Sequence, residues 1–299
     1  MKTSEKLRFS IVIPCYNEAN FIRETLISLK AQDTTEKYEI IVVDNNCNDE
    51  TVKIARDYGA TIVTEKQAGV CFARQAGTES AKGEIIVSTD ADTVFSPGWL
   101  SFIDNCFNKS EKIVAIGGPC RYYNGPWWGK FYTYFLFSTV YLYYLATGHP
   151  FYITATNIAF KKSVWQGYDT RLMQGGDELD LLHELRRRGK VRFSNSNPTY
   201  TSGRRLSNGL AYNFFITFLF YYLGAYYINK AFKRTVIGSA PAFRKINSSR
   251  ALQRAGFGLV PLVFTILVIV FAVTPLRLFL SHNVHSLFIL IADKLRAMV

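Results

Sequence analysis

Two acidic groups in the chain have the residue types and spacing needed to act on phosphates and protons. The first is the pair Asp90 and Asp92, which are two positions apart in the sequence and closely follow the apolar run 84–88. Residues two apart in an extended backbone point the same way, so the two carboxylates can share one hard divalent cation, Mg²⁺ or Mn²⁺. Such a cation would bridge the phosphate oxygens of a ligand. A turn or a helix cap is the structural alternative for this short motif.

The second acidic group follows two glycines and reads Asp177, Glu178, Leu179 and Asp180. One of its carboxylates could be a general base that removes a proton from an acceptor hydroxyl group. Acids also favour the first turn of a helix, and the basic run 186–188 suits the end of one. From the residues alone, the catalytic and the structural interpretations both stay open.

A pair of arginines, Arg204 and Arg205 in TSGRR, is the third candidate. Guanidinium groups suit bidentate contacts to phosphate, although arginines also flank membrane segments. The chain has no GxGxxG and no GxxxxGK[ST], which argues against a dinucleotide or P-loop site. Its five cysteines form no CxxC pair, which argues against a zinc ribbon or a disulfide framework.

The elements that must position these side chains alternate along the first 100 residues. Apolar runs predict strands at 9–13, 38–43, 60–64 and 84–88, and periodic stretches predict helices at 18–32, 49–58 and 69–81. This order predicts an α/β fold with a mostly parallel sheet and helices on both faces. Ligands of such sheets bind at the carboxyl ends of strands. Polar residues gather there, at 14–18, 44–46 and 90–92.

Charge divides the chain into two unlike parts. The whole chain has 299 residues, of which 48% are hydrophobic and 15% aromatic, a composition that excludes a disordered protein. Residues 1–200 hold 23 Lys+Arg and 22 Asp+Glu (23 − 22, net +1), whereas residues 201–299 hold 12 and one (12 − 1, net +11). The positive residues flank long uncharged runs, which favours a membrane surface over nucleic acid as the partner.

Three stretches predict contact with a membrane. The aromatic stretch 131–148 is expected to be a membrane-proximal insertion, and 206–229 is expected to lie in the interface or to span. The apolar run 255–276 is long enough to cross a bilayer, and 284–292 could form a second helix that brings the chain back to the cytoplasmic side. Basic residues between 230 and 254 predict that this side is cytoplasmic. We therefore expect a catalytic domain over 1–205 on the cytoplasmic face of a membrane, followed by a membrane-associated helical region over 206–299.

Across residues 9–192, roughly, the sequence resembles the family-2 glycosyltransferases, which have the GT-A fold. Six segments carry the resemblance, in this order: FSIVIPCYNEANFIRETLISLKAQ, EIIVVDNNCNDET, KQAGVCFARQAG, GEIIVSTDADTVFSPGWL, ATNIAFKKSVWQGYDTRL and GGDELDLLHELRRRG. The resemblance implies inverting, metal-dependent transfer of a sugar from a nucleotide-diphosphate sugar, most often a UDP-sugar. It also implies a GT-A, Rossmann-like sheet followed here by C-terminal hydrophobic segments.

The family's site residues can be carried over by position. The resemblance places these residues at the nucleotide-sugar site: Pro14, Tyr16, Glu18, Asp44, Gly69, Arg74 and Asp90. Among them, Asp44 corresponds to the residue that recognises the nucleotide base of the donor. Asp90 and Asp92 correspond to the DxD motif, with Asp92 the more direct ligand of Mg²⁺ or Mn²⁺.

In this family, the catalytic base that deprotonates the acceptor lies in a block usually written Glu-Asp-x-Asp-Leu. Here the two acids are swapped, and alignment on Asp180 makes Glu178 the base, with Asp177 as the alternative. The QxxRW motif of processive members is absent, so we do not expect processive polymer synthesis. By analogy, Arg204 and Arg205 would hold the leaving diphosphate instead.

The sequence thus predicts a transferase that uses a nucleotide-sugar donor and a membrane-associated acceptor. The acceptor would be a polyprenyl phosphate, a lipid-linked glycan or a glycolipid. A sugar nucleotidyltransferase is the enzyme alternative, but PCYNEAN after the first strand is not the Gly-rich basic loop that it needs. A membrane scaffold with a decayed transferase domain is the other alternative, and the retained acids argue against it. The sugar and the oligomeric state are left open.

Overall fold

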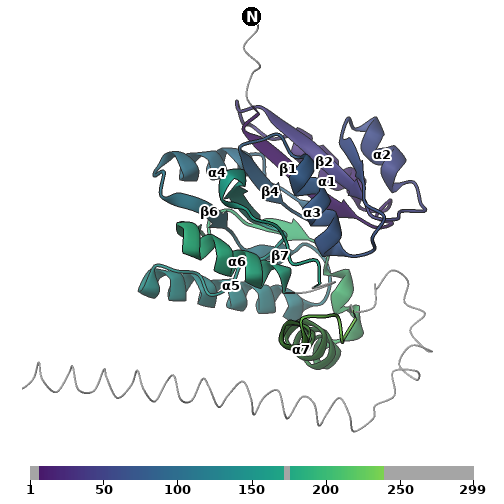
Figure 1. Ribbon diagram of the computed structural model, residues 1–299, viewed down its shortest axis with the longest axis vertical. Coiled ribbons are helices and arrows are strands. Elements are labelled where there is room, and N and C mark those ends of the chain that lie inside the picture. The colour runs from purple at the N-terminus through teal and green to yellow at the C-terminus, as the bar shows by residue number, and fades with distance from the viewer. Residues whose placement is uncertain (1–6, 172–175, 239–299) are drawn as a thin grey trace, which may run out of the picture.

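A computed structural model describes residues 7–171 and 176–238 of the chain. Seven strands form the main sheet, in the order β3-β2-β1-β4-β8-β6-β9 (Figure 1). Their bounds are β1 Phe9–Cys15, β2 Tyr38–Asp44, β3 Thr61–Thr64, β4 Ile85–Ser88, β6 Ile113–Gly117, β8 Ile158–Lys161 and β9 Lys190–Phe193. The four predicted strands are confirmed, and they are neighbours in the parallel half of the sheet.

The sheet is mixed, because one strand runs against the others. β8 lies between β4 and β6 and is antiparallel to both, whereas β6 and β9 are parallel. The sheet is therefore mostly parallel, as predicted, with one reversed strand that the sequence did not indicate.

Alternating side chains of the strands build two cores. In β1, Phe9, Ile11 and Ile13 pack into one hydrophobic cluster, and Val12 packs into a second cluster on the opposite face. The first cluster includes residues of α1 (Ile22–Lys30), α2 (Thr51–Asp57) and α4 (Trp99–Asn108). The second includes residues of α3 (Val70–Ser80) and α6 (Asp177–Arg188). Helices thus cover both faces, as predicted.

A second sheet of three very short strands stands beside the motif Asp90–Asp92. Its order is β5-β10-β7, with β5 at Thr93–Val94, β10 at Thr199–Thr201 and β7 at Cys120–Tyr122. β5 begins directly after Asp92, and Thr201 of β10 pairs with Thr93. This pairing brings the segment after β10, which contains Arg204, to the acidic motif.

The aromatic stretches of the sequence are helical. α5 covers Trp127–Thr147, and the segment after β10 forms η2 (Gly203–Asn208), η3 (Tyr212–Gly224) and α7 (Ala225–Phe232); a short turn, η1, covers Lys162–Val164. α5 and α7 both lie on the lower side of the molecule in Figure 1. Within residues 7–171 and 176–238, no helix is both long enough and apolar enough to cross a bilayer. The predicted segments 255–276 and 284–292 lie outside the described residues.

Candidate active site

The carboxyl ends of β1, β2 and β4 meet at one edge of the main sheet. The parallel register pairs Cys15 with Asp44 at the ends of β1 and β2, and it pairs Val12 with Ser88 of β4. The polar segments that follow these strands therefore leave the sheet side by side, as the sequence predicted. Glu18, Asp90 and Asp92 lie in these segments, and Asp44 is the last residue of β2.

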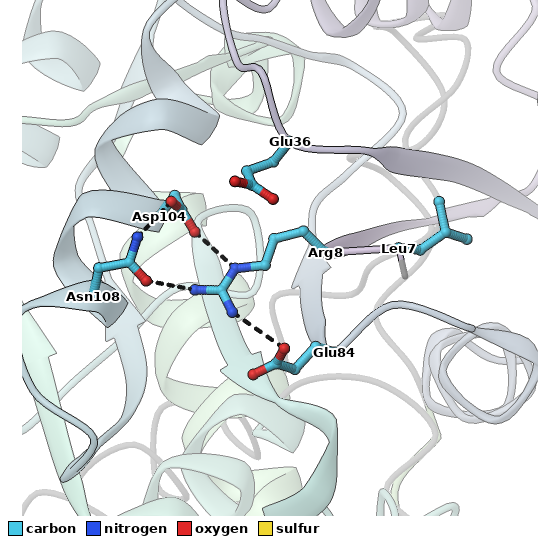
Figure 2. Close-up of a pocket in the computed structure, with 6 residues that line it drawn as sticks. All are labelled: Leu7, Arg8, Glu36, Glu84, Asp104 and Asn108. Carbon is cyan, nitrogen blue, oxygen red and sulfur yellow. Dashed lines mark hydrogen bonds and ion pairs between the residues drawn. The ribbon is translucent and has the colours of Figure 1, made fainter. Parts of the chain in front are cut away.

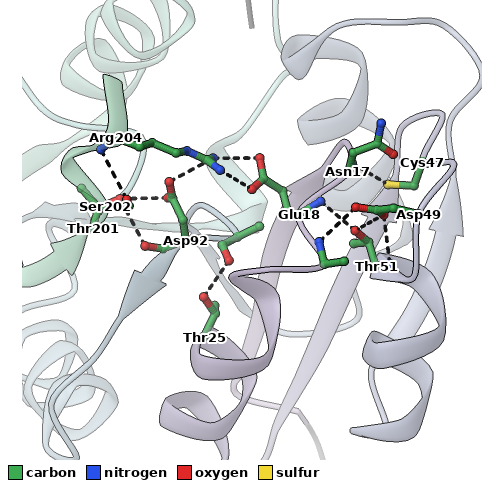
Figure 3. A network of polar contacts seen from close by, with 12 residues as sticks. Asn17, Glu18, Thr25, Cys47, Asp49, Thr51, Asp92, Thr201, Ser202 and Arg204 are labelled. Atoms are coloured by element: carbon green, nitrogen blue, oxygen red, sulfur yellow. Dashed lines mark hydrogen bonds and ion pairs between the residues drawn. The ribbon is translucent and has the colours of Figure 1, made fainter. Parts of the chain in front are cut away.

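Arg204 joins the first and the third of these segments. Figure 3 shows its guanidinium group reaching across Asp92 to Glu18. Its two terminal nitrogens donate to the Glu18 carboxylate at 2.7 and 2.8 Å, and one lies 3.0 Å from Asp92 Oδ2. The guanidinium carbon also lies 4.5 Å from the centre of the Phe21 ring. Of the two predicted arginines, this one is held rigidly at the acidic motif.

Asp92 is a buried carboxylate among other negative groups. Its side chain is 11% exposed, and it accepts a hydrogen bond of 2.9 Å from the Thr201 hydroxyl group. Burial raises the pKa of Asp92 to about 6, and the charges of Asp90 and Glu18 act in the same direction, whereas Arg204 opposes them. A further cation at this place would therefore be stabilised by unbalanced negative charge.

Arg74 links the two acidic groups of the sequence. It is buried on α3, its Nη1 donates to Asp177 Oδ2 at 2.6 Å, and its Nη2 donates to Asp90 Oδ1 at 3.0 Å. Arg74, which was predicted to lie at the nucleotide site, thus lies between Asp90 of the predicted metal motif and Asp177, the alternative candidate base. It joins residues that are 16 and 103 positions away from it in the sequence.

The two candidate bases have different environments. Although burial opposes ionisation of Asp177, the ion pair with Arg74 lowers the pKa of this carboxyl group. Burial, followed by the charge of Asp177, raises the pKa of Glu178 to about 8. Glu178 Oε1 accepts a hydrogen bond of 2.9 Å from the Tyr222 hydroxyl group. The pKa of Glu178 is thus raised and that of Asp177 lowered, and the two differ mainly because Asp177 is paired with Arg74.

The predicted nucleotide side of the site is held by local hydrogen bonds. Asp44 Oδ1 accepts from the Cys47 amide at 2.8 Å, and Asn45 Oδ1 accepts from the Gly69 amide at 2.9 Å. Gly69 has φ +145°, a conformation that side chains disfavour, directly before α3. Asn45 therefore fixes the segment 65–69 against the end of β2.

Three other predicted residues lie at the margin of the site. Pro14 is part of β1, and the Tyr16 ring is largely exposed in the loop that follows. Arg205 is exposed beside Tyr122, and in the described part of the chain it shares none of the ion pairs of Arg204. The structure thus separates the two arginines that the sequence grouped.

Asp90 and Asp92 are the two carboxylates that could share a divalent cation, and each also faces an arginine, Arg74 and Arg204 respectively. Among the described residues, no group of three or more His, Cys, Asp or Glu side chains could hold a metal ion. Mg²⁺ and similar ions commonly take one or two carboxylates and complete their coordination with water and substrate phosphates. The two carboxylates therefore fit a cation that is shared with a bound diphosphate.

A second arginine cluster lies at the opposite end of β1. Arg8, just before this strand, donates to Asp104 at 2.7 Å and to Asn108 at 2.9 Å and pairs with Glu84 (Figure 2). With Glu36 and Leu7, these residues line a pocket of about 320 Å³. Ligands of such sheets bind at the carboxyl ends of strands, so we assign the Arg8 cluster, at the other end of β1, a role in holding the fold and no role in ligand binding.

Three residues of the site lie in segments that stand out in the sequence, but they were not predicted to be site residues. Thr201 and Asn45 hold Asp92 and Gly69 respectively, and Tyr222 holds Glu178. Each acts through a contact between segments that are far apart in the chain. Only the position of Asn45 directly after a predicted strand could have drawn attention to it.

Comparison with known proteins assigns this fold and site to a family. Residues 10–167, more than half of the chain, match the sequence profile of glycosyl transferase family 2. The chain belongs to that family, which is an inverting one. The glycosyltransferase AglE of Haloferax volcanii is 35% identical over 98 residues, which cover 30% of this chain and 32% of AglE. The match thus spans about a third of that relative.

Solved structures share the fold. The mannosyltransferase PcManGT of Pyrobaculum calidifontis, in complex with GDP-Man and Mn²⁺, has a TM-score of 0.58 at 18% identity, and the match covers 94% of this chain and 81% of PcManGT. Residues 1–349 of S. aureus TarS, in complex with UDP, have a TM-score of 0.52 at 16% identity, over 66% and 60% of the two chains. These similarities show that the α/β fold of this chain is GT-A-like.

Proposed function

We propose that the chain transfers a sugar from a nucleoside-diphosphate sugar, with UDP as the first nucleotide to test, to an acceptor at a membrane surface. The main support is one arrangement: Arg74 and Arg204 tie Asp90 and Asp92 to Glu18 on one side and to Asp177, beside Glu178, on the other. Family membership and the nucleotide-bound structural neighbours support the nucleotide-sugar donor.

The donor's diphosphate would lie over Asp90 and Asp92. A Mg²⁺ or Mn²⁺ ion bound there would neutralise the charge that grows on the leaving diphosphate. Arg204, fixed by Glu18 beside Asp92, presents guanidinium nitrogens to the same oxygens. Asp44 and the Gly69 segment would hold the nucleoside. These residues would bind and orient the donor.

Glu178 would act as the base. Its carboxylate takes the proton of an acceptor hydroxyl group as the acceptor oxygen attacks the anomeric carbon. The bond from that carbon to the diphosphate oxygen breaks, and its electron pair leaves with the nucleoside diphosphate. Attack from the opposite face inverts the anomeric carbon. A pKa that burial has raised suits this role, because a stronger base accepts the proton more readily.

Titration calorimetry of UDP tests the donor site. In the presence of Mn²⁺, the wild-type protein should bind UDP, and Asp92→Asn should lose most of that affinity. Asp57→Asn makes the same chemical change at an exposed position on α2 and should bind as the wild type does. Binding that is equal with and without Mn²⁺, or unchanged in Asp92→Asn, would contradict the proposed site. GDP and dTDP titrations show whether another nucleotide is preferred.

The membrane-surface acceptor is supported by the outer face of α5. The buried positions of this helix are Gly129, Thr133, Phe137 and Val140, and its other side exposes large apolar side chains: Trp127 (80% exposed), Phe131, Tyr134, Phe135, Leu142 and Leu145. Trp, Tyr and Phe are enriched where proteins meet the headgroup layer of a bilayer. Basic residues follow α7 at Lys233 and Arg234. An acceptor carried by a lipid would reach the site from this side, on the cytoplasmic face.

Vesicle sedimentation tests this part of the proposal. Phe131→Ser combined with Phe135→Ser should weaken binding to vesicles of anionic lipid several-fold, because less apolar surface is buried in the bilayer. Ile27→Ser also removes an exposed apolar side chain, but from α1, and should leave vesicle binding unchanged. Equal vesicle binding by all variants, or efficient transfer to a soluble acceptor without lipid, would count against a membrane acceptor.

A further inference from the structure

The helical segment 212–232 is fastened to the acidic block of α6 by two tyrosines. Tyr222 of η3 donates a hydrogen bond of 2.9 Å to Glu178 Oε1, and Tyr226 of α7 donates one of 2.6 Å to Asp180 Oδ1. Lys230 also contacts the Asp180 carboxylate. These three residues recur every four positions and therefore share one face of the segment. That face lies against the start of α6.

A glycine makes this close approach possible. Gly176, directly before α6, has φ +88°, and a Cβ atom there would lie 2.3 Å from Cδ2 of Tyr226. The Tyr226 ring also packs with Cys71 of α3. Any side chain at 176 would push the segment away from the acidic block. The sequence around Glu178 is thus adapted to receive the tyrosine segment.

Tyr222 is the neutral hydrogen-bond donor that faces Glu178. Within the described residues, the other ionisable groups that act on this carboxylate include Asp177 and Arg74, Cys71 on α3 and Tyr152 before β8. Asp177 repels a charged Glu178, and Arg74 is engaged with Asp177 and Asp90. A hydrogen bond donated to a carboxylate stabilises its ionised form and fixes the direction of its oxygens.

We propose that Tyr222 is a positioning residue for Glu178: its hydroxyl group orients the carboxylate and favours the ionised state that accepts a proton. The inference rests on the proposed function only in naming Glu178 as the base. Its consequence is that the segment 212–232 completes the catalytic site. Glu178 is in its working state when this segment is seated on α6.

NMR titration of the carboxyl carbons of ¹³C-labelled glutamate, in the full chain, tests the contact directly. The signal that disappears in Glu178→Gln identifies the residue. In Tyr222→Phe, the midpoint of this signal should move upward by about one pH unit, since the ionised form loses its donor. With a UDP-sugar that supports turnover, the acidic limb of kcat/KM for the acceptor should move by the same amount, and the donor KM should stay constant.

Two further variants separate positioning from packing. Tyr227→Phe removes a hydroxyl group from an exposed ring on the same helix and should leave the Glu178 midpoint unchanged. Tyr226→Phe loosens the segment at Asp180 and should move the midpoint less than Tyr222→Phe does. An unchanged midpoint in Tyr222→Phe, or a loss of activity that is equal at every pH, would overturn the inference. An active Glu178→Gln variant would instead overturn the base assignment and leave the NMR result standing.

Discussion

Arginines meet carboxylates at both ends of β1, in very different surroundings. Before the strand, Arg8 is 18% exposed at the side chain and contacts Glu84 and Asp104 at the rim of an open pocket. Beyond the other end, Arg74 is 6% exposed and contacts Asp177, which is 3% exposed, inside the protein, and Asp90, which is 35% exposed, at its surface. Electrostatic interactions are weak where water screens them and strong where it is excluded. The comparison shows that the buried pair Arg74–Asp177, more than the presence of ion pairs as such, distinguishes the end of the sheet that carries the candidate site.

The buried end also carries unbalanced charge. The described residues place five carboxylates around two arginines there: Glu18, Asp90, Asp92, Asp177 and Glu178 around Arg74 and Arg204. The surplus raises the pKa of Asp92 and of Glu178, on top of the larger effect of burial. A divalent cation would neutralise part of the surplus at Asp92, and a proton from the acceptor would neutralise another part at Glu178. The predictions below test how these roles divide.

Replacing the proposed base should have the largest effect. Glu178→Gln keeps the shape of the side chain and its neighbours but cannot accept a proton. We expect the rate of transfer to fall by about 10²–10⁴-fold, the size of the contribution that general-base catalysis makes. UDP binding by calorimetry should be unchanged, because within the described residues Glu178 shares no hydrogen bond or ion pair with Asp90, Asp92 or Arg204, the proposed diphosphate residues.

Asp177→Asn is the matched comparison for that variant. It leaves Arg74 paired with Asp90 alone, so we expect lower thermal stability and a smaller loss of transfer. If Asp177→Asn abolished transfer and Glu178→Gln kept it, the assignment of the base would be off by one residue.

Removing the Arg204 guanidinium group should have an intermediate effect. Arg204→Ala frees Glu18 and Asp92 from their shared partner and removes the proposed phosphate contact. We expect the affinity for UDP with Mn²⁺ to fall about tenfold, the size of a lost charge-assisted contact. Calorimetry beside Arg205→Ala gives the contrast, since Arg205 lies outside the ion pairs. Equal losses in the two variants would mean that both arginines contact the donor.

The acidic motifs could be found from the sequence because each is local. Asp90 and Asp92 directly follow an apolar strand, and the parallel order of strands predicts the shared edge where Glu18 and Asp44 also lie. The choice between Glu178 and Asp177 could not be made in the same way. It depends on Arg74, which is 103 positions away from Asp177 and carries no mark of its partner in its own neighbourhood.

The remaining differences also come from contacts that no local pattern encodes. The apolar residues of β8 are typical of a buried strand, but they carry no information on the direction in which that strand runs in the sheet. β5 has two residues and β10 has three, too few for any periodicity. The segment 206–229 stands out in the sequence by its lack of charge and its many aromatic residues, and neither property indicates that the Tyr222 hydroxyl group contacts Glu178.

The smallest effect is expected at the exposed end of β1. Arg8→Ala removes contacts to Asp104, Asn108 and Glu84, all near solvent. The free energy of unfolding should fall by about 1 kcal/mol, the scale of partly exposed ion pairs, which lowers Tm by about 2–4 °C. UDP affinity should stay within about twofold, because the cluster and the donor site lie at opposite ends of the strand. A clear loss of UDP binding would show that β1 transmits a change at the Arg8 cluster to the proposed donor site. The two arginine clusters would then not be independent of each other.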